Sequence, residues 1–496
     1  MNIASIMPFS VLVPLIAAPA CALLPGRRLP WALAWVCALA ALVITALTLA
    51  ATIEGRTLAY AFGDWPPPIG IEYRVDAANA FVALLLAAMA AFILPWAKTS
   101  VDWEVPERQG PFYCLFLLAL AGLLGITLTG DIFNVFVFLE ISSLATYGLI
   151  AHGRDRRALL AAFRYLIMGT VGATFLLIGI GLLYMLTGTL NMADLAERLP
   201  AVRDNRAVVV ALAFIIVGMS LKLALFPLHQ WLPGAYTYAP SFISAFLAAT
   251  ATKVALYVML RLVFTVFAPD YSFVAIPLTA VFMVLAIAGM FAGSWAALFQ
   301  HNLKRMLAYS SVAQVGYMVL GISLASVLGL TASMLHLFNH GLMKAALFMA
   351  LGAVAYRAGG VRIEDVRGLG RHMPWTLTAF ALAGVSLIGL PPTAGFISKW
   401  YLILAALEAG QGWLVALILI TSLMAAVYIA RVVEAAWLQP RPEGAPAVRE
   451  APLSLLVPLW VMVAANFYFG LDTRLSVGAA TAAAEALMGG VPGGTP

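Results

Sequence analysis

Residues 211–233 read ALAFIIVGMSLKLALFPLHQWLP, an apolar run long enough to cross a lipid bilayer. The run holds two residues that a lipid-exposed helix does not tolerate unaided, Lys222 and Pro227. A lysine at mid-span costs about 2.5–3.5 kcal/mol on insertion scales, and a proline frees backbone carbonyls. Both are acceptable only where protein or cavity water satisfies them. The stretch therefore predicts a broken membrane helix whose lysine faces the interior of a helix bundle.

The composition of the whole chain indicates the same class of protein. The 496 residues are 63% hydrophobic and 10% charged, whereas a soluble domain carries about 25% charged residues. We find about 14 apolar segments of the length that a span needs, which predicts an all-α, multi-pass membrane protein. They lie near residues 8–25, 31–51, 75–97, 111–128, 131–151, 158–186, 207–231, 241–267, 272–296, 306–325, 328–355, 374–408, 412–437 and 453–471. The segment 374–408 is too long for one straight span and contains Pro391 and Pro392, so we expect it to be broken.

The loops between these segments are short, and their charges predict an orientation. The longest, near 52–74 and 187–206, leave no room for a nucleotide, flavin or iron–sulfur domain, and we expect no cofactor and no metal. Basic residues are enriched in cytoplasmic loops. One side has 15 of them, at positions 27, 28, 98, 108, 154, 156, 157, 304, 305, 357, 362, 367, 371, 441 and 449, and the other side has 6, at 56, 74, 198, 203, 206 and 474. This bias predicts that both termini lie on the outer side of the membrane, which we expect to be the bacterial inner membrane.

The remaining basic residues lie inside predicted spans. Lys222, Lys253 and Lys399 have apolar residues on both sides, and Glu140 is the one obvious deep carboxylate. One carboxylate cannot neutralise three lysines, although salt bridges that hold the bundle together are the alternative interpretation. Burial disfavours the charged form of an amine, which suits a group that must gain and lose a proton. For Arg164, Arg261 and Arg431, snorkelling to an interface is an equally good interpretation.

The stretch HLFNHGLMKAALF carries His336, His340 and Lys344 on one helix face. Core histidines that donate to backbone carbonyls are the plainer interpretation, and a metal site is weakly supported because the helix offers no carboxylate. A buried pair of histidines with a lysine one turn further suits a proton relay. His229, beside Pro227, would extend the same polar line.

A weak internal repeat accompanies the two predicted breaks. Residues 142–148 (SSLATYG) resemble residues 310–316 (SSVAQVG) at an offset of 168, and Pro227 and Pro391 are 164 residues apart. Each repeat would hold five spans, an odd number, so the copies must have opposite orientations. Paired broken spans are a sequence sign of a transporter's ion site. We expect four parts: 1–105 with three spans, repeats at 106–268 and 269–438, and 439–496 with the last helix and a tail.

Five motifs in this order resemble the proton-translocating antiporter-like subunits of respiratory complex I, membrane-bound hydrogenases and Mrp-type Na+/H+ antiporters. They are TGDIFNVFVFLEI, LKLALFPLHQWLP, HNLKRMLAYSSVAQVGYM, HLFNHGLMKAALF and GLPPTAGFISKW. The resemblance implies 14 helices with two inverted five-helix repeats and broken seventh and twelfth helices. It also implies a proton path with four parts. These are Glu140 with Lys222 at the intake, Lys253 at the centre, His336 and His340 as the link, and Lys399 at the outlet, with His229 and Lys344 secondary.

The resemblance also implies a function. Length and the TGDIFNVFVFLEI motif are most similar to the Mrp D subunit, so we expect a subunit of a Na+/H+ antiporter that is not catalytic alone. Its partners would be other membrane subunits, protons and Na+, and no nucleic acid. A complex I-type or hydrogenase subunit is the alternative, although one such subunit has glutamate where this chain has Lys399. A scaffold whose buried charges are frozen salt bridges is the rival from another class.

Overall fold

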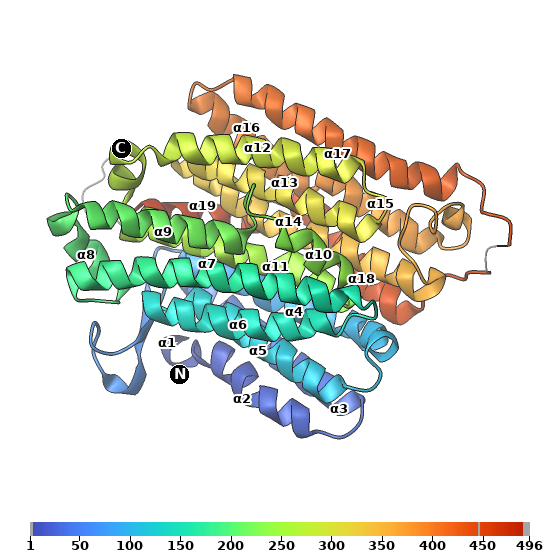
Figure 1. Cartoon of the computed structure of the whole chain (residues 1–496), viewed down its shortest axis with the longest axis horizontal. Helices are drawn as coiled ribbons and strands as arrows, with labels where there is room; N and C mark the ends of the chain where they lie inside the picture. The colour runs from blue at the N-terminus through green and yellow to red at the C-terminus, as the bar shows by residue number, and fades with distance from the viewer. Residues whose placement is uncertain (1–2, 445–446, 490–496) are drawn as a thin grey trace.

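The computed structural model describes residues 3–444 and 447–489, and it is a bundle of long, nearly parallel helices (Figure 1). Within these ranges, thirteen helical segments are long and apolar enough to cross a membrane. The remaining predicted span, 374–408, the twelfth in chain order, is present as two short helices, α15 (Pro374–Ile388) and α16 (Ala394–Glu408). The all-α membrane fold with broken seventh and twelfth spans is therefore confirmed.

The first half of the chain comprises α1 (Ile3–Ile6), α2 (Phe9–Leu23), α3 (Arg28–Thr52), β1 (Leu58–Ala61), β2 (Glu72–Val75), α4 (Ala77–Glu104), α5 (Gln109–Leu128), α6 (Ile132–Ala151), α7 (Arg157–Thr187), α8 (Met192–Val202), α9 (Arg206–Leu223), α10 (Trp231–Tyr238) and α11 (Ser241–Leu260). A π-helical extension of α11, η2 (Arg261–Val266), leads through η3 (Asp270–Ala275) into the second half. That half comprises α12 (Leu278–Leu298), α13 (Leu303–Ser323), α14 (Val327–Ala358), α15 (Pro374–Ile388), α16 (Ala394–Glu408), α17 (Trp413–Trp437), α18 (Leu453–Leu471) and α19 (Arg474–Met488).

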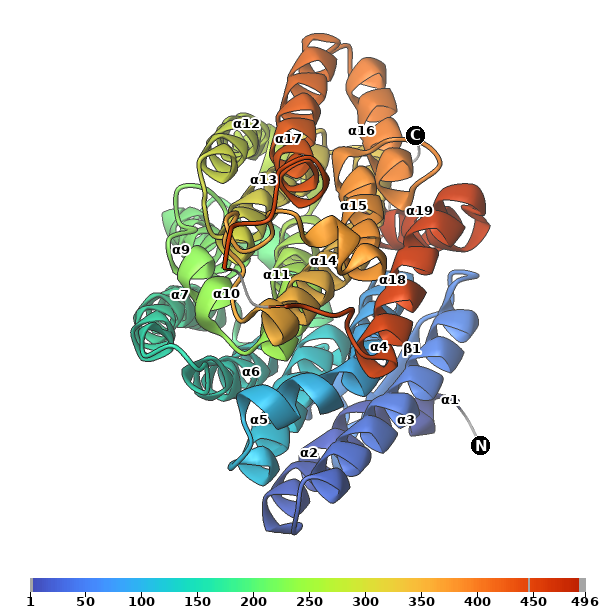
Figure 2. The ribbon, with the colours of Figure 1, turned by 90° about the vertical axis from the view of Figure 1, so that its right-hand side faces the viewer.

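Two helices form the axis of the bundle. In the end-on view, α11 and α14 lie in the middle and the other helices surround them (Figure 2). All of the apolar window of α14 and 94% of that of α11 are buried, against 33–39% for α2, α3, α7, α12, α17 and α18. The outer helices thus separate the polar residues of α11 and α14 from lipid, where unpaired polar groups are costly.

Both breaks have the backbone geometry that the prolines predict. The helix α9 ends at Leu223, Ala224 adopts a left-handed conformation (φ 59°), and α10 starts only at Trp231. Similarly, α15 ends at Ile388 and is followed by Gly389 with φ 90°, a conformation that glycine adopts without a Cβ clash. Carbonyls that lose their helical partners at these breaks are available to side chains.

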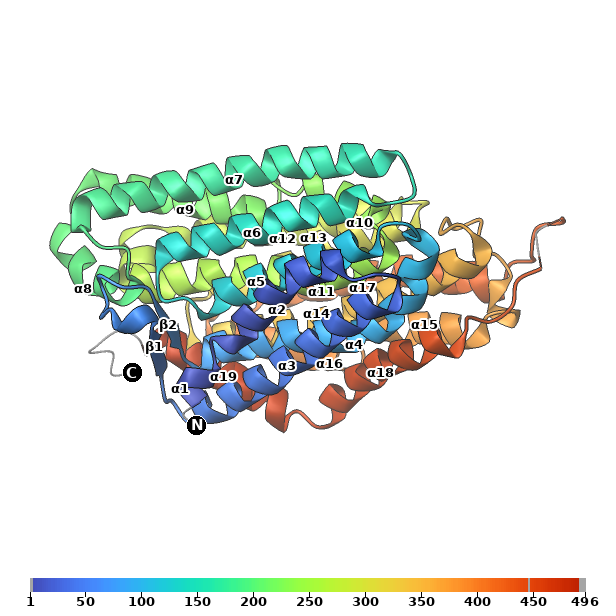
Figure 3. The same ribbon diagram turned by 90° about the horizontal axis from the view of Figure 1, so that it is seen from below.

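The end of the bundle that carries the loop between α3 and α4 holds structure that we did not predict. The strands β1 and β2 form an antiparallel hairpin, and α8 lies in the segment expected to be a long loop. The amide of Gly130 donates to the carbonyl of Glu72, and Asn191 Nδ2 donates to Glu72 Oε1 at 2.7 Å, so hairpin, α6 and α8 are joined. Figure 3 places α1, α8, α19 and the hairpin at one end, which we call the hairpin end.

The four-part division remains a prediction. Each half contains one broken helix, α9–α10 in the range 106–268 and α15–α16 in the range 269–438, as the repeat requires. Beyond residue 439, however, the expected tail contains a helix. This helix, α19, buries its alanines against α4 and α14. The small side chains of α19 allow it to pack closely against α4 and α14. Apolar periodicity alone did not predict this helix.

Candidate functional site

The predicted intake pair is formed across two helices. Lys222 lies in the last turn of α9, and its Nζ is 3.5 Å from Glu140 Oε1 of α6. The same amine donates to Ser143 Oγ at 3.0 Å, whereas Glu140 Oε1 accepts no hydrogen bond within the described chain. The side chain of Lys222 is 6% exposed and that of Glu140 is 25% exposed. The contact is therefore an ion pair without a hydrogen bond, and a small movement can open it.

A cavity adjoins this pair and extends toward the central helix. It has about 30 Å³ of space for water, and one water needs roughly 10–15 Å³. Its lining includes Lys222, Ser143 and Thr146 on one side and Ala251, Val254, Ala255 and Val258 of α11 on the other. Water in this cavity would reach the Lys222 amine and the helix that carries Lys253.

Lys253 occupies the centre of the molecule. It is fully buried on α11, and its Nζ donates to the carbonyl of Ala248 in its own helix. Its helix packs against α14, which carries His336, His340 and Lys344. No carboxylate of the described residues lies within 4 Å of its amine. Within the described chain, no ion pair therefore fixes the charge of the central lysine.

His336 connects α14 to both of its neighbours. Its Nδ1 lies 2.8 Å from Ser398 Oγ of α16, and its Nε2 lies 2.8 Å from Gln314 Oε1 of α13. Because a carbonyl oxygen only accepts, the proton of the neutral ring is on Nε2, and Nδ1 accepts from the serine hydroxyl. That hydroxyl is also 3.2 Å from the carbonyl of Gly395. It can turn there when Nδ1 gains a proton, so the ring can change its charge without losing a hydrogen bond.

The second histidine has a different environment. His340 stacks on His336 with ring centroids 6.1 Å apart. It is fully buried, and neither ring nitrogen has a partner among the residues that the structure describes. Lys344, one turn further, donates to the carbonyl of Leu307 at 2.7 Å and to Ser310 Oγ. His336 and Lys344 thus lie on one face of α14, and both contact α13.

Lys399 stabilises the second break. Its Nζ donates to the freed carbonyls of Ile388 and Leu387 at 2.8 and 3.3 Å and to Ser422 Oγ at 2.8 Å. The amine also lies 4.7 Å from the ring centre of Tyr317. A cation is favoured at the carboxyl end of α15, since the helix dipole is negative there. Lys399 follows Ser398 in the sequence, so the histidine link and the predicted outlet are adjacent.

The remaining predicted residue lies apart from this series. His229 is half-buried between α9 and α10, where it stacks on Phe226 with ring centroids 5.4 Å apart. Its Nδ1 has no hydrogen-bond partner in the described chain, and no contact joins it to Lys222. Among the same residues, no group of three or more His, Cys, Asp or Glu side chains could hold a metal ion.

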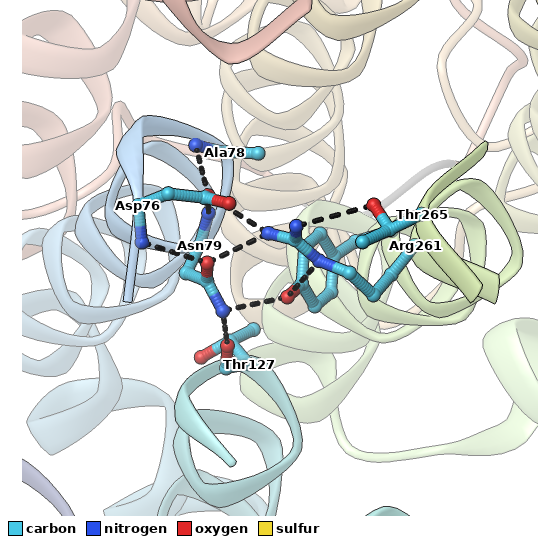
Figure 4. Close-up of polar contacts among 7 residues, drawn as sticks. Asp76, Ala78, Asn79, Thr127, Arg261 and Thr265 are labelled. Carbon is cyan, nitrogen blue, oxygen red and sulfur yellow. Dashed lines mark hydrogen bonds and ion pairs between the residues drawn. The ribbon is translucent and has the colours of Figure 1, made fainter. Parts of the chain in front are cut away.

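Two charged residues are buried where the sequence analysis did not expect it. Lys304, which we assigned to a loop, is 5% exposed. It donates to Ser241 Oγ at 3.0 Å, and Ser241 also donates to Glu104. Arg261, which could have reached an interface, is 8% exposed and pairs with Asp76 at 2.8 Å (Figure 4). The Asp76-x-x-Asn79 pattern before an apolar run is a capping-box signal that could have located this partner.

The carboxyl of Asp76 lies just before α4 begins and is held in its charged form. Burial raises the pKa of this carboxyl, but the Arg261 guanidinium and the N–H groups of Ala78 and Asn79 outweigh that effect, and its pKa lies below the ordinary value. The pair is therefore a permanent feature of this end of the bundle at neutral pH.

Comparison with known proteins defines the class. Residues 129–425 match the family described as NADH:quinone oxidoreductase/Mrp antiporter, TM. The match covers more than half of the chain, so this protein belongs to that family and is an antiporter-like subunit of an Mrp or complex I-type complex. It is a multi-pass membrane protein that associates with other membrane subunits.

Relatives from both kinds of complex are similar to this chain. The N subunit of NADH-quinone oxidoreductase from Desulforudis audaxviator is 46% identical over 91% of this chain and 93% of its own length. The D subunit of the Na(+)/H(+) antiporter from Alkalihalophilus pseudofirmus is 30% identical over 69% of each chain. A chain in the structure of the Mrp complex from Dietzia sp. DQ12-45-1b superposes with a TM-score of 0.90 at 28% identity, with 98% of both chains covered.

Proposed function

We propose that this chain is a proton-translocating subunit and that protons move along its buried lysines, histidines and glutamate. The observation that carries the proposal is the series of titratable groups inside the bundle. It runs from Glu140 and Lys222 through Lys253 to His340, His336 and Lys399, across helices α6, α9, α11, α14 and α16. Of these lysines only Lys222 has a carboxylate within 4 Å in the described chain, so the others are not frozen in ion pairs.

The intake pair would act as a switch. Two unit charges about 4 Å apart attract by about 4 kcal/mol at an effective dielectric constant of 20. Separating Glu140 from Lys222 by a few ångströms removes much of that attraction, and the lysine then releases its proton more readily. The adjoining cavity provides room for a water between the lysine and α11. The proton would pass next to Lys253.

The histidine link would operate by proton exchange at the His336 ring. A proton from Lys253 is accepted through His340 by His336 Nδ1, and the Ser398 hydroxyl turns to the Gly395 carbonyl. When the His336 ring releases this proton to Lys399, the residue after Ser398, the Ser398 hydroxyl turns back to Nδ1. Lys399 would then release the proton at the second break. Its amine has the carbonyls of the break and Ser422 Oγ as its other hydrogen-bond partners there.

We infer further that the parent complex is a Na+/H+ antiporter, so that proton movement is coupled to Na+ in the opposite direction. Support comes from the superposition on the Mrp complex chain over nearly the full length of both chains. The relative that is 46% identical is named as a NADH-quinone oxidoreductase subunit, and it supports a redox-driven complex as the second candidate.

Inverted membrane vesicles from cells that carry chromosomal variants test the function. A pH-sensitive dye reports proton movement after addition of Na+ or, separately, of NADH. We expect Lys222→Met and Glu140→Gln each to abolish the driven proton movement, because each removes half of the switch, while the complex still assembles on a native gel. Arg164→Gln, an exposed arginine in α7, is the matched control and should behave as wild type.

Normal proton movement in both variants would refute the proposal. A response of the wild type to Na+ and not to NADH supports the antiporter, whereas a response to NADH alone assigns the chain to a redox-driven complex. A variant complex that fails to assemble while transport per assembled complex stays normal would instead support the scaffold interpretation.

A further inference from the structure

A second line of groups leaves the central lysine along its own helix. Lys253, Tyr257 and Arg261 are spaced by four residues on α11 and its π-helical extension, and they lead toward the hairpin end. Their exposures are 0%, 2% and 8%. A side chain every fourth residue lies on the same helix face, so this face would offer protons a short route from Lys253 to the hairpin end.

The route ends in a network of fixed hydrogen bonds (Figure 4). The Arg261 guanidinium donates to Asp76 Oδ1 at 2.8 Å and to Asn79 Oδ1 at 2.7 Å, both at the start of α4. It also donates to Tyr257 Oη and to Thr265 Oγ1, each at 3.3 Å. The amide of Asn79 donates to Tyr257 Oη at 2.7 Å. All three guanidinium nitrogens are thus in use, and α4 is fastened to α11.

The direction of these hydrogen bonds does not suit a relay. Proton hopping needs a chain in which each group accepts on one side and donates on the other. Tyr257 Oη instead accepts from both Arg261 and Asn79. The Asn79 amide also donates to the carbonyl of Thr127 at 2.6 Å, so its two ends are occupied. A guanidinium does not give up its proton in proteins, and a fixed arginine in a pore is a barrier to protons and cations.

The cavity beside Lys222 borders the same stretch of α11. Its lining on α11 consists of Ala251, Val254, Ala255 and Val258, and Arg261 is three residues beyond Val258, less than one helical turn. Lys253 is not part of this lining. Its own line to the hairpin end runs through Tyr257 and Arg261, and without the network a proton on Lys253 could leave along that line without passing through α14.

We propose that Arg261, held by Asp76 and Asn79, is a charge barrier that closes the hairpin end of the central lysine and directs protons toward the histidine link. The proposal rests on the proposed function, because it assigns the barrier to the same proton path. Arg261 acts as a positioning and specificity residue, and it exchanges no proton itself.

The test measures passive proton leak, with no Na+ and no NADH, as the decay of an imposed pH gradient across vesicles that contain the complex. Arg261→Met should raise the leak by about tenfold. Eight residues of helix rise place Arg261 about 12 Å from Lys253. At an effective dielectric constant of 20, the interaction of two unit charges at that distance corresponds to about a tenfold change. Asp76→Asn, which breaks the same ion pair and leaves the cation in place, should leak no more than wild type. Arg261→Lys should restore the low leak.

Arg261→Met and Asp76→Asn remove the same ion pair, so a purely structural role of the pair predicts equal leaks. A leak in Arg261→Met alone indicates a charge barrier. Arg203→Met and Asp270→Asn form the matched control. These two residues make an exposed arginine–aspartate pair at 3.7 Å, and neither variant should leak. Adding Lys253→Leu to Arg261→Met should abolish the extra leak, since the path runs through that lysine. If Arg261→Met does not assemble on a native gel, Arg261→Gln replaces it, since glutamine keeps hydrogen-bonding groups without charge.

Equal leaks in Arg261→Met and Asp76→Asn, no leak in Arg261→Met, or a leak that persists with Lys253→Leu would each overturn the barrier. Driven proton movement of the wild type is recorded in the same vesicles. Its absence would refute the proposed function, whereas normal driven movement together with a tight Arg261→Met would refute only the barrier.

Discussion

His336 and His340 are one turn apart on α14, and their hydrogen bonding differs completely. His336 has a partner on each ring nitrogen, Ser398 and Gln314. His340 has none in the described chain, although both residues are buried. A buried polar group without a partner is costly, and it persists where function requires it or where water is present. The two residues should therefore respond differently to the same substitution.

We expect His336→Leu to destabilise the protein by about 1–3 kcal/mol, because it leaves the buried Gln314 Oε1 without its donor and leaves Ser398 with only the Gly395 carbonyl. His340→Leu removes no hydrogen bond to protein and should leave stability close to that of wild type, while it stops driven proton movement. Thermal unfolding of the purified complex, followed by loss of intact complex on a native gel, measures the first effect, and the vesicle dye assay measures the second. Equal stabilities of the two variants would contradict this assignment.

At the scale of the element, the breaks in α9–α10 and α15–α16 supply carbonyls that a continuous helix would use internally. At the first break Trp231 Nε1 donates to the carbonyl of Leu221 at 2.8 Å, and at the second Lys399 satisfies Ile388 and Leu387. The second break also requires close backbone contact. A Cβ on Gly395 would lie 1.8 Å from the carbonyl oxygen of Ser386 and 2.8 Å from Met343 Cε.

Gly395→Ala should therefore push α15 and α16 apart and destabilise the protein by at least about 1–3 kcal/mol, the usual range for overpacking. Because Ser398 and Lys399 move with α16, proton movement should fall as well. Gly181→Ala in α7 is the matched control, since a Cβ there meets nothing within 4 Å. It should be neutral or stabilise by up to about 1 kcal/mol. The amount of assembled complex after heating compares the two, and an unaffected Gly395→Ala would mean that the break is more open than described.

At the scale of the whole molecule, the two ends of the bundle differ. The hairpin end carries β1, β2, α8, α19 and the Arg261 network (Figure 3). The opposite end carries the loop between α6 and α7, where Arg156 is exposed. Loops at that opposite end hold most of the basic residues, and the positive-inside rule predicts that it is cytoplasmic.

Labelling with a membrane-impermeant maleimide tests this orientation. Arg56→Cys replaces an exposed residue between α3 and β1, and it should react in intact cells. Arg156→Cys should react only in inverted vesicles. The native Cys21, Cys37 and Cys114 are buried or half-buried, and replacing them with serine gives the background. The reverse pattern would place both termini in the cytoplasm and exchange intake and outlet.

Much of the fold could be predicted because its signals are local. Apolar runs of span length, prolines at mid-span and lysines between apolar residues each reveal themselves within about 20 residues. The hairpin and α8 were missed, since each strand has four residues and α8 has eleven, too few for a clear period. The predicted lysines and the two histidines of α14 are buried in the bundle, whereas His229 lies apart from them. Lys304 was misassigned because it stands beside Arg305 at a helix start.

The sequence by itself determined that this is a membrane protein with two broken helices and with more buried lysines than carboxylates. These properties follow from hydropathy and from the chemistry of single residues. The partners of these residues depend on how the helices pack. Ser143 meets Lys222 across 79 residues, Ser398 meets His336 across 62, and Asp76 meets Arg261 across 185. The physical reason is that the charge states and the direction of proton transfer depend on hydrogen bonds between helices. Helix packing forms these bonds between residues far apart in the sequence, so no local sequence pattern predicts them.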